Sequence, residues 1–170
     1  EIKGKMSNTA YKNTTFFEKF VSSEFENIRL GRLSRKSSDN DYDNMYKLAK
    51  KADYIILPTF VGVRSFQGTV DIDSRHLSFI NKLIELNKPL VVISFGNPYI
   101  INKFSNVPAY LTSYGGVYYS QKAMFDALFG RTVIGGKLPI TIPDTDYKFG
   151  HGLKRFPNTL KSPFGGADSN

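Results

Sequence analysis

The sequence contains no cysteine and no tryptophan, and its only histidines are His76 and His151. Without cysteine the chain can form no disulfide framework, no thiolate zinc site and no cysteine nucleophile. No apolar run approaches the roughly 18 residues that a membrane-spanning helix needs, so we expect no membrane span. The lack of cysteine does not identify the compartment, which leaves export and a cytoplasmic location both open.

The motifs of several enzyme classes are missing as well. There is no Gly-x-Ser-x-Gly elbow of a serine hydrolase and no Gly-x-Gly-x-x-Gly fingerprint of a dinucleotide site. A serine hydrolase would also need a histidine beside its nucleophile, and nothing in the spacing of His76 or His151 suggests one. We therefore identify no catalytic residue in this chain and expect no cofactor.

Two further patterns are close to ligand-binding motifs but differ from them at required positions. The aspartates at positions 39, 41 and 43 alternate as calcium ligands do, but Asn44 and Lys50 stand where a calcium loop needs Gly and Glu. Segment 130–137 is close to a phosphate-binding loop, but Gly136 separates its lysine from the second glycine of the motif, and Leu138 follows where Ser or Thr is needed. We interpret the first pattern as helix capping and the second as a turn, and we expect no metal site.

The composition is typical of one globular domain. The 170 residues are 41% hydrophobic and 22% charged, which suits a chain with a buried core rather than a disordered one. The net charge of +8 raises the question of nucleic-acid binding, but the cations are scattered along the chain without interleaved aromatics on one face. We therefore expect a solvated basic surface and no nucleic-acid partner. The chain begins at Glu1 rather than Met, which we interpret as the start of a piece of something longer.

Strong apolar runs alternate with helical patterns along the chain, and this order predicts a mostly parallel sheet with helices on both faces. We expect a three-layer α/β/α sandwich of flavodoxin-like appearance, with a sheet of about five or six strands. The predicted helices cover residues 14–24, 42–52, 73–87 and 117–129. The predicted strands cover residues 27–33, 54–57, 90–95, 109–114 and 138–142.

Residues 1–145 are expected to form the single domain, and residues 146–170 a tail or linker, because the sequence there becomes polar and rich in Gly and Pro. The prolines that flank the strand 138–142 place this last strand at an edge of the sheet. The fold also calls for a first strand before residue 14. Residues 1–7 make a poor strand, so this strand is expected to be truncated.

Three segments occur in an order that is informative about family. Residues 88–99 have the sequence Lys-Pro-Leu-Val-Val-Ile-Ser-Phe-Gly-Asn-Pro-Tyr, and residues 130–143 have Gly-Arg-Thr-Val-Ile-Gly-Gly-Lys-Leu-Pro-Ile-Thr-Ile-Pro. Residues 147–153 follow with Tyr-Lys-Phe-Gly-His-Gly-Leu. Over roughly residues 14–153 the chain thus resembles the C-terminal α/β domain of family 3 glycoside hydrolases, most closely the bacterial β-N-acetylhexosaminidase branch.

The resemblance implies a reaction and a division of labour. In that family an N-terminal barrel supplies an Asp nucleophile for retaining hydrolysis of a β-glycoside, and the α/β sandwich packs beside it. The acid/base is either a Glu from a sandwich loop, as in β-glucosidases, or a His-Asp pair on the barrel, as in the N-acetylhexosaminidase branch. In the corresponding loop, residues 65–71, Gln67 precedes Gly68, and an amide cannot donate a proton as a carboxylic acid does. The loop therefore favours the N-acetylhexosaminidase-like branch.

The resemblance makes this chain an auxiliary domain of a parent that acts on β-linked N-acetylglucosamine-type sugars. Its expected partners are the catalytic barrel of the same polypeptide and carbohydrate, and the isolated chain is expected to be inactive and able to dimerise through the orphaned barrel face. A free-standing carbohydrate-binding or protein-interaction module remains the alternative. A flavodoxin-like nucleotide or signalling domain is disfavoured, because Pro58-Thr59 follows the central strand where a receiver would have an Asp.

Ligands of doubly wound sheets bind beyond the carboxyl ends of the strands. Segments 59–67, 96–98 and 114–116 should meet at that edge. Arg and Gln could donate hydrogen bonds to sugar hydroxyls there, and an aromatic ring could stack on a pyranose. These segments could equally be ordinary connections packed on a neighbouring domain. The candidate substrate-binding residues are Arg64, Ser65, Phe66, Gln67, Asn97 and Tyr114.

Overall fold

The computed structural model describes residues 14–61, 72–104 and 106–157. The chain passes in order through α1 (Thr14–Glu24), α2 (Asp39–Lys51), β1 (Ile55–Thr59), α3 (Ser74–Ile84), β2 (Leu90–Ser94), the 3-10 helix η2 (Pro98–Lys103), β3 (Ala109–Thr112) and α4 (Tyr118–Leu128). No helix of these segments is both long and apolar enough to cross a membrane.

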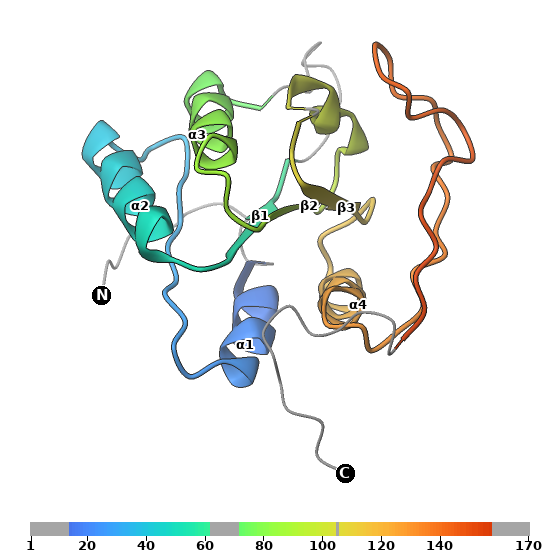
Figure 1. Ribbon diagram of the computed structural model, residues 1–170, viewed down its shortest axis with the longest axis horizontal. Helices are drawn as coiled ribbons and strands as arrows, with labels where there is room; N and C mark the ends of the chain where they lie inside the picture. Colours follow the sequence, from blue (N-terminus) through green and yellow to red (C-terminus); the bar gives the residue numbers. More distant parts are fainter. Residues whose placement is uncertain (1–13, 62–71, 105, 158–170) are drawn as a thin grey trace.

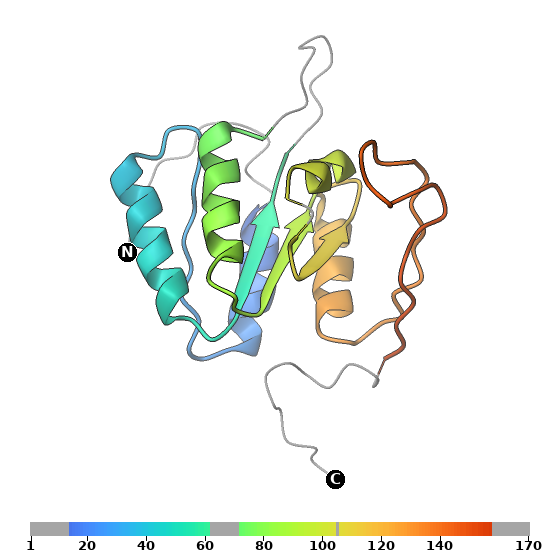
Figure 2. The same ribbon diagram turned by 45° about the horizontal axis from the view of Figure 1, so that its top comes forward.

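The sheet is parallel and has β2 at its centre, in the order β1-β2-β3. Successive side chains of β2 enter two different cores, because side chains of a strand alternate between its faces. Val92 packs with residues of α2, α3 and η2, whereas Ile93 packs with residues of α1 and α4, and both are fully buried. Helices α2 and α3 thus cover one face of the sheet and α1 and α4 the other (Figures 1 and 2). The expected α/β sandwich with parallel strands is confirmed.

The strand expected at residues 27–33 is absent, so that prediction was wrong. The segment follows an irregular path that side chains hold in place. Arg32 donates two hydrogen bonds to Glu18 of α1, and Gly31 passes so close to Met45 of α2 that a Cβ would overlap the methionine sulfur. Because its alternation is weak and Leu30 stays exposed, the segment lacks the apolar face that would pair it with the sheet.

The strand expected at residues 138–142 is also absent, because this segment folds back on the chain that follows it. The Leu138 N–H donates to His151 O at 2.8 Å and the Ile142 N–H donates to Tyr147 O at 2.9 Å. Farther along, Ile134 and Arg155 form an isolated antiparallel bridge. Pro139 and Pro143 have no N–H for a ladder, which limits this segment to widely spaced hydrogen bonds.

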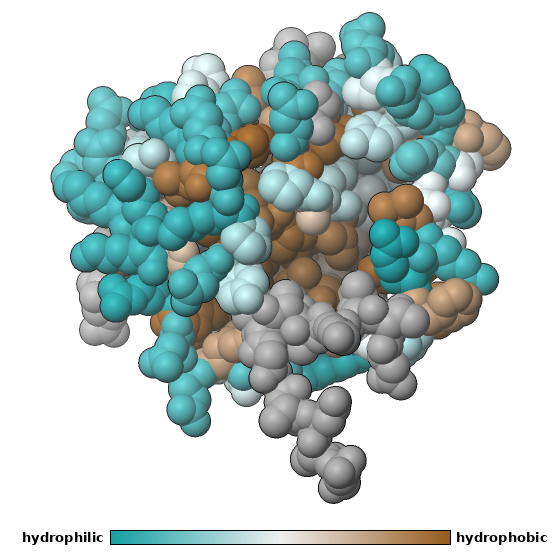
Figure 3. Space-filling view, in the orientation of Figure 1, coloured by the Kyte–Doolittle hydropathy of each residue, from teal (hydrophilic) through white to brown (hydrophobic). Residues whose placement is uncertain are grey.

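We call residues 131–157 the arm, the orange-to-red segment at the side of the sheet in Figure 1. The arm is anchored by Ile142, which is buried in the same core as α2 and α3. Residues 146–157 of the expected tail therefore pair with residues 134–142, while the domain boundary at residue 145 stays a prediction. On one face of the molecule, hydrophobic residues remain visible at the centre within a hydrophilic surround (Figure 3).

The described residues contain three strands, fewer than the expected number. The last of them, β3, ends the sheet on one side. The first strand expected before residue 14 lies outside the described residues.

Gln121 joins the layer of α1 and α4 to the end of the sheet. Its side chain is fully buried; its Oε1 accepts a hydrogen bond from the Phe17 N–H at 2.8 Å, and its Nε2 donates to Gly116 O at 2.7 Å. The Phe17 N–H belongs to the first turn of α1. Gln121 therefore caps α1 from the first turn of α4 and fixes the loop after β3.

Replacing Gln121 with Leu should lower the free energy of unfolding by about 2–4 kcal/mol, because it leaves a buried donor and a buried acceptor unpaired. Urea unfolding followed by circular dichroism measures the change. The matched control is Lys122→Gln, which removes the half-exposed Lys122–Asp126 ion pair and the contact of the ammonium with the Phe125 ring and should cost less than about 1 kcal/mol. Equal costs for the two variants would show that Gln121 does not hold the layers together.

Tyr110 of β3 places a hydroxyl group in a mostly buried position under η2. Its hydroxyl donates to Pro98 O at 3.3 Å, and its ring lies 6.3 Å from that of Phe104. Burial raises the pKa of Tyr110 to about 12. The neutral phenol is therefore favoured in the folded protein.

Stability should fall as the pH rises above about 10, where the phenol of the unfolded chain loses its proton, and the fall should level off near the folded pKa of about 12. The Tyr110→Phe variant should show a shallower loss of unfolding free energy across this window. Urea unfolding at about pH 8 and about pH 11 tests this. An unchanged slope in the variant would mean that another group titrates.

Candidate functional site

At the carboxyl edge of the sheet, backbone hydrogen bonds continue past the ends of the strands. The Phe95 N–H donates to Thr59 O at 2.8 Å, and the Ser113 N–H donates to Ser94 O at 2.9 Å. The rings of Phe60 and Phe95 stack at 4.8 Å above the ends of β1 and β2. Gly116 lies against the ring of Phe60 and the Cβ of Phe95, and a Cβ at Gly116 would come within 3.2 Å of the Phe60 ring. The loop after β3 therefore closes over a fixed aromatic pair.

Asn97 takes part in the turn at this edge. Its side chain is 1% exposed, and its Oδ1 accepts a hydrogen bond from the Tyr99 N–H at 3.0 Å as the N-cap of η2. Its backbone carbonyl accepts a hydrogen bond from the hydroxyl of Ser94 at 2.8 Å. The structure thus places Asn97 beneath the surface, where it shapes the edge.

Tyr114 lies at the surface of the same edge and is 51% exposed. Partial burial, with a smaller contribution from nearby Tyr99, raises the pKa of Tyr114 above the ordinary value of tyrosine. Tyr118 and Tyr119 follow on α4, with ring centroids 5.3 Å apart, and Tyr119 is 80% exposed. We call the exposed side chains at this edge the aromatic rim: Tyr99, Tyr114, Val117, Tyr118 and Tyr119.

The remaining predicted site residues, Arg64, Ser65, Phe66 and Gln67, lie outside the described residues. Of the six candidates, the structure therefore brings only Asn97 and Tyr114 to one edge. The rim residues Val117, Tyr118 and Tyr119 had been assigned to a predicted helix. Their exposure gives no periodic signal in the sequence, which is why sequence reasoning missed them.

Three acidic side chains form an ion pair or cap a helix, so they have structural roles. Glu24 pairs with Arg131 at 2.5 Å, and Asp41 forms a capping box with Ser38, which confirms the capping interpretation of that aspartate. Asp73 caps α3; the hydrogen bond from the Arg75 N–H holds its pKa below the usual range. The described residues hold no cluster of three or more His, Cys, Asp or Glu side chains suited to a metal ion.

The two histidines contact tyrosines. His76 Nδ1 lies 3.2 Å from the hydroxyl of Tyr42, and His151 packs its ring 5.0 Å from that of Tyr147 in the arm. These contacts fit packed or surface imidazoles.

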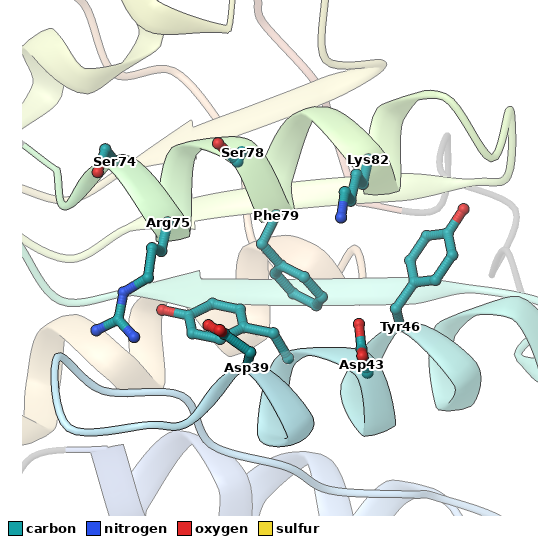
Figure 4. Close-up of a pocket in the computed structure, with 9 residues that line it drawn as sticks. Asp39, Asp43, Tyr46, Ser74, Arg75, Ser78, Phe79 and Lys82 are labelled. Carbon is teal, nitrogen blue, oxygen red and sulfur yellow. The ribbon is translucent and has the colours of Figure 1, made fainter.

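A cavity of about 240 Å³ lies between α2 and α3 (Figure 4). Tyr42 and Tyr46 recur at helical spacing in the predicted helix 42–52, but this spacing does not show how that helix packs on α3, so it does not predict the lining. The cavity is lined by Asp39, Tyr42, Asp43, Tyr46, Ser74, Arg75, Ser78, Phe79 and Lys82. Asp39 and Asp43 lie on the same wall, so they cannot flank a glycosidic bond from two sides as the carboxyl pair of a glycosidase does.

The sequence and the fold of this chain are similar to those of known proteins. A probable exo-1,4-β-xylosidase of Aspergillus fumigatus is 28% identical over 127 residues, which cover 69% of this chain and 16% of the relative. A probable β-glucosidase I of Aspergillus oryzae is 28% identical over 124 residues, covering 68% of this chain and 14% of the relative. The matched part of the chain thus spans only 14–16% of the length of these relatives.

A solved structure shares the fold with a TM-score of 0.64 at 22% identity, over 79% of this chain and 14% of that one. It is described as a fungal multi-domain GH3 β-N-acetylglucosaminidase with a GCN5-related glucosamine N-acetyltransferase region. Residues 2–165 match the family described as Glycosyl hydrolase family 3 C-terminal domain. The chain therefore belongs to the C-terminal domain family of family 3 glycosyl hydrolases.

Proposed function

We propose that the chain is the auxiliary C-terminal domain of a retaining β-glycosidase and packs on a catalytic barrel of the same polypeptide. The family match and the much greater length of the relatives support this proposal. In the cavity between α2 and α3, Asp39 and Asp43 lie on one wall, so this cavity has no opposed pair of carboxylates for a two-step displacement. The domain then contributes structure, and its partner contributes the acid/base and the nucleophile.

The aromatic rim is the observation that carries the proposal. Phe16 in the first turn of α1 packs edge-on against Tyr118 at 5.1 Å, so the chain enters the described fold beside the rim. We therefore propose the aromatic rim as the surface that contacts the barrel. Exposed aromatic groups gathered in one place mark interaction surfaces, and burial against a barrel would remove them from water. In the isolated chain the same surface could join two copies, as expected for an orphaned interface.

The sugar is proposed to be a β-linked N-acetylglucosamine type. The presence of Gln67 before Gly68 supports this, since a β-glucosidase-type acid would need a carboxyl group there. The structural neighbour is described as a β-N-acetylglucosaminidase, whereas the sequence relatives are described as a xylosidase and a glucosidase. A substrate panel on the whole polypeptide should therefore include all three glycosides.

The isolated chain should hydrolyse none of the chromogenic β-N-acetylglucosaminide, β-glucoside and β-xyloside, because it lacks the nucleophile. The polypeptide that includes the preceding region should turn over the N-acetylglucosaminide fastest. Turnover by the isolated chain that a Gln67 or Asp71 substitution abolishes would overturn the auxiliary role. Absence of a barrel in the preceding coding sequence would instead support a free-standing binding module.

Tyr119→Asp should weaken the contact between the barrel and this domain in the whole polypeptide, because it would bury a charge in an apolar interface. Limited proteolysis between the two domains should become at least about tenfold faster, while the unfolding of the isolated chain stays within about 0.5 kcal/mol of the parent. The control is Leu30→Asp, which places the same charge at an exposed apolar position outside the rim. Equal proteolysis rates for the two variants would remove the rim from the interface.

A further inference from the structure

The cavity between α2 and α3 lies in the other helical layer, across the sheet from α1 and α4 (Figure 1). Phe79 of α3 points into the space between the helices, and Tyr46 stands at one end of it (Figure 4). Phe79 is 8% exposed, so its ring forms an apolar floor. The cavity thus combines an aromatic surface, formed by Phe79, with polar side chains around it.

The two walls carry opposite charges that cancel. Helix α2 contributes Asp39 and Asp43, and helix α3 contributes Arg75 and Lys82. An anionic ligand would approach two carboxylates, and a cationic ligand would approach two basic groups. A neutral ligand with many hydroxyl groups avoids both repulsions, because a hydroxyl both donates to carboxylates and accepts from ammonium groups.

One end of the cavity is already fixed by contacts within the protein. Arg75 donates to Ser37 O at 2.9 Å and Arg35 O at 2.8 Å, and its guanidinium lies 5.6 Å from the ring centre of Tyr42. These contacts hold the Arg75 side chain in place. They also use much of the capacity of its guanidinium to donate hydrogen bonds to a ligand.

The other end holds Asp43, Tyr46, Ser78 and Lys82. Among the described residues, no side chain or backbone group hydrogen-bonds the carboxylate of Asp43 or the ammonium of Lys82. Both polar groups are therefore available to a ligand above Phe79. Pockets for drug-sized molecules measure about 300–1,000 Å³, so a cavity of about 240 Å³ suits a smaller ligand, such as one sugar ring.

We propose that this cavity binds one neutral pyranose residue. The apolar face of the sugar lies toward Phe79 and Tyr46, its hydroxyls donate to Asp43, and Lys82 donates to the sugar oxygens. The site is distinct from the aromatic rim and needs no catalytic barrel, so its failure would leave the proposed function unaffected. It would give the domain a means of holding one sugar residue of a carbohydrate chain.

Titration of the isotope-labelled chain with N-acetylglucosamine, glucose and xylose, followed by amide NMR shifts, tests the site. Shifts should map to α2 and α3 around Asp43 and Lys82. Lys82→Met keeps the aliphatic stem and removes the donor, and Asp43→Asn removes the charge; each should weaken binding about tenfold. The matched control Lys51→Met, at the exposed end of α2, should bind like the parent.

Four results would overturn the proposal. The first is saturating sugar that shifts no resonance of α2 or α3. The second is binding that Lys82→Met and Asp43→Asn leave unchanged. The third is binding that Tyr114→Ala abolishes instead, which would place the sugar on the aromatic rim. The fourth is tighter binding of glucuronate or glucosamine than of the neutral sugars, which would show that a charge decides recognition.

Discussion

The burial of β2 on both faces is the constraint on which the fold depends. Val92 and Ile93 point in opposite directions and are both fully removed from water, so the strand must lie between two helical layers. Its parallel partners then bring three strand ends to one edge of the sheet. Every feature of the candidate site at that edge follows from this placement, including the stacked Phe60 and Phe95 and the loop at Gly116.

Continuous apolar runs made the central elements predictable from the sequence. The strands at 90–95, 109–114 and 54–57 and the four helices were all expected near their observed positions. The segments 27–33 and 138–142 were misassigned, because short alternating or proline-flanked runs say little without a partner strand. Leu30 faces water, and residue 138 pairs with residues 150 and 151 of the arm. Pairing between distant segments is a tertiary property that local pattern does not contain.

The site was only partly predictable for a related reason. Strand topology places the segments that contain Asn97 and Tyr114 at the same edge of the sheet, and their role in a site stays a prediction. It does not say which side chains turn inward, and Asn97 became a cap while Tyr114 stayed exposed. The cavity between α2 and α3 depends on how two helices pack side by side, and the helical period of Tyr42 and Tyr46 could not reveal that arrangement.

The amide of Gln121 connects three segments of the molecule: α1, α4 and the loop after β3. The chain before α1 is attached to a helix whose first turn is bonded to α4 and, through the same amide, to the Gly116 loop. The first turn of α1 and the Gly116 loop, which are far apart in the sequence, are therefore positioned by the same amide side chain.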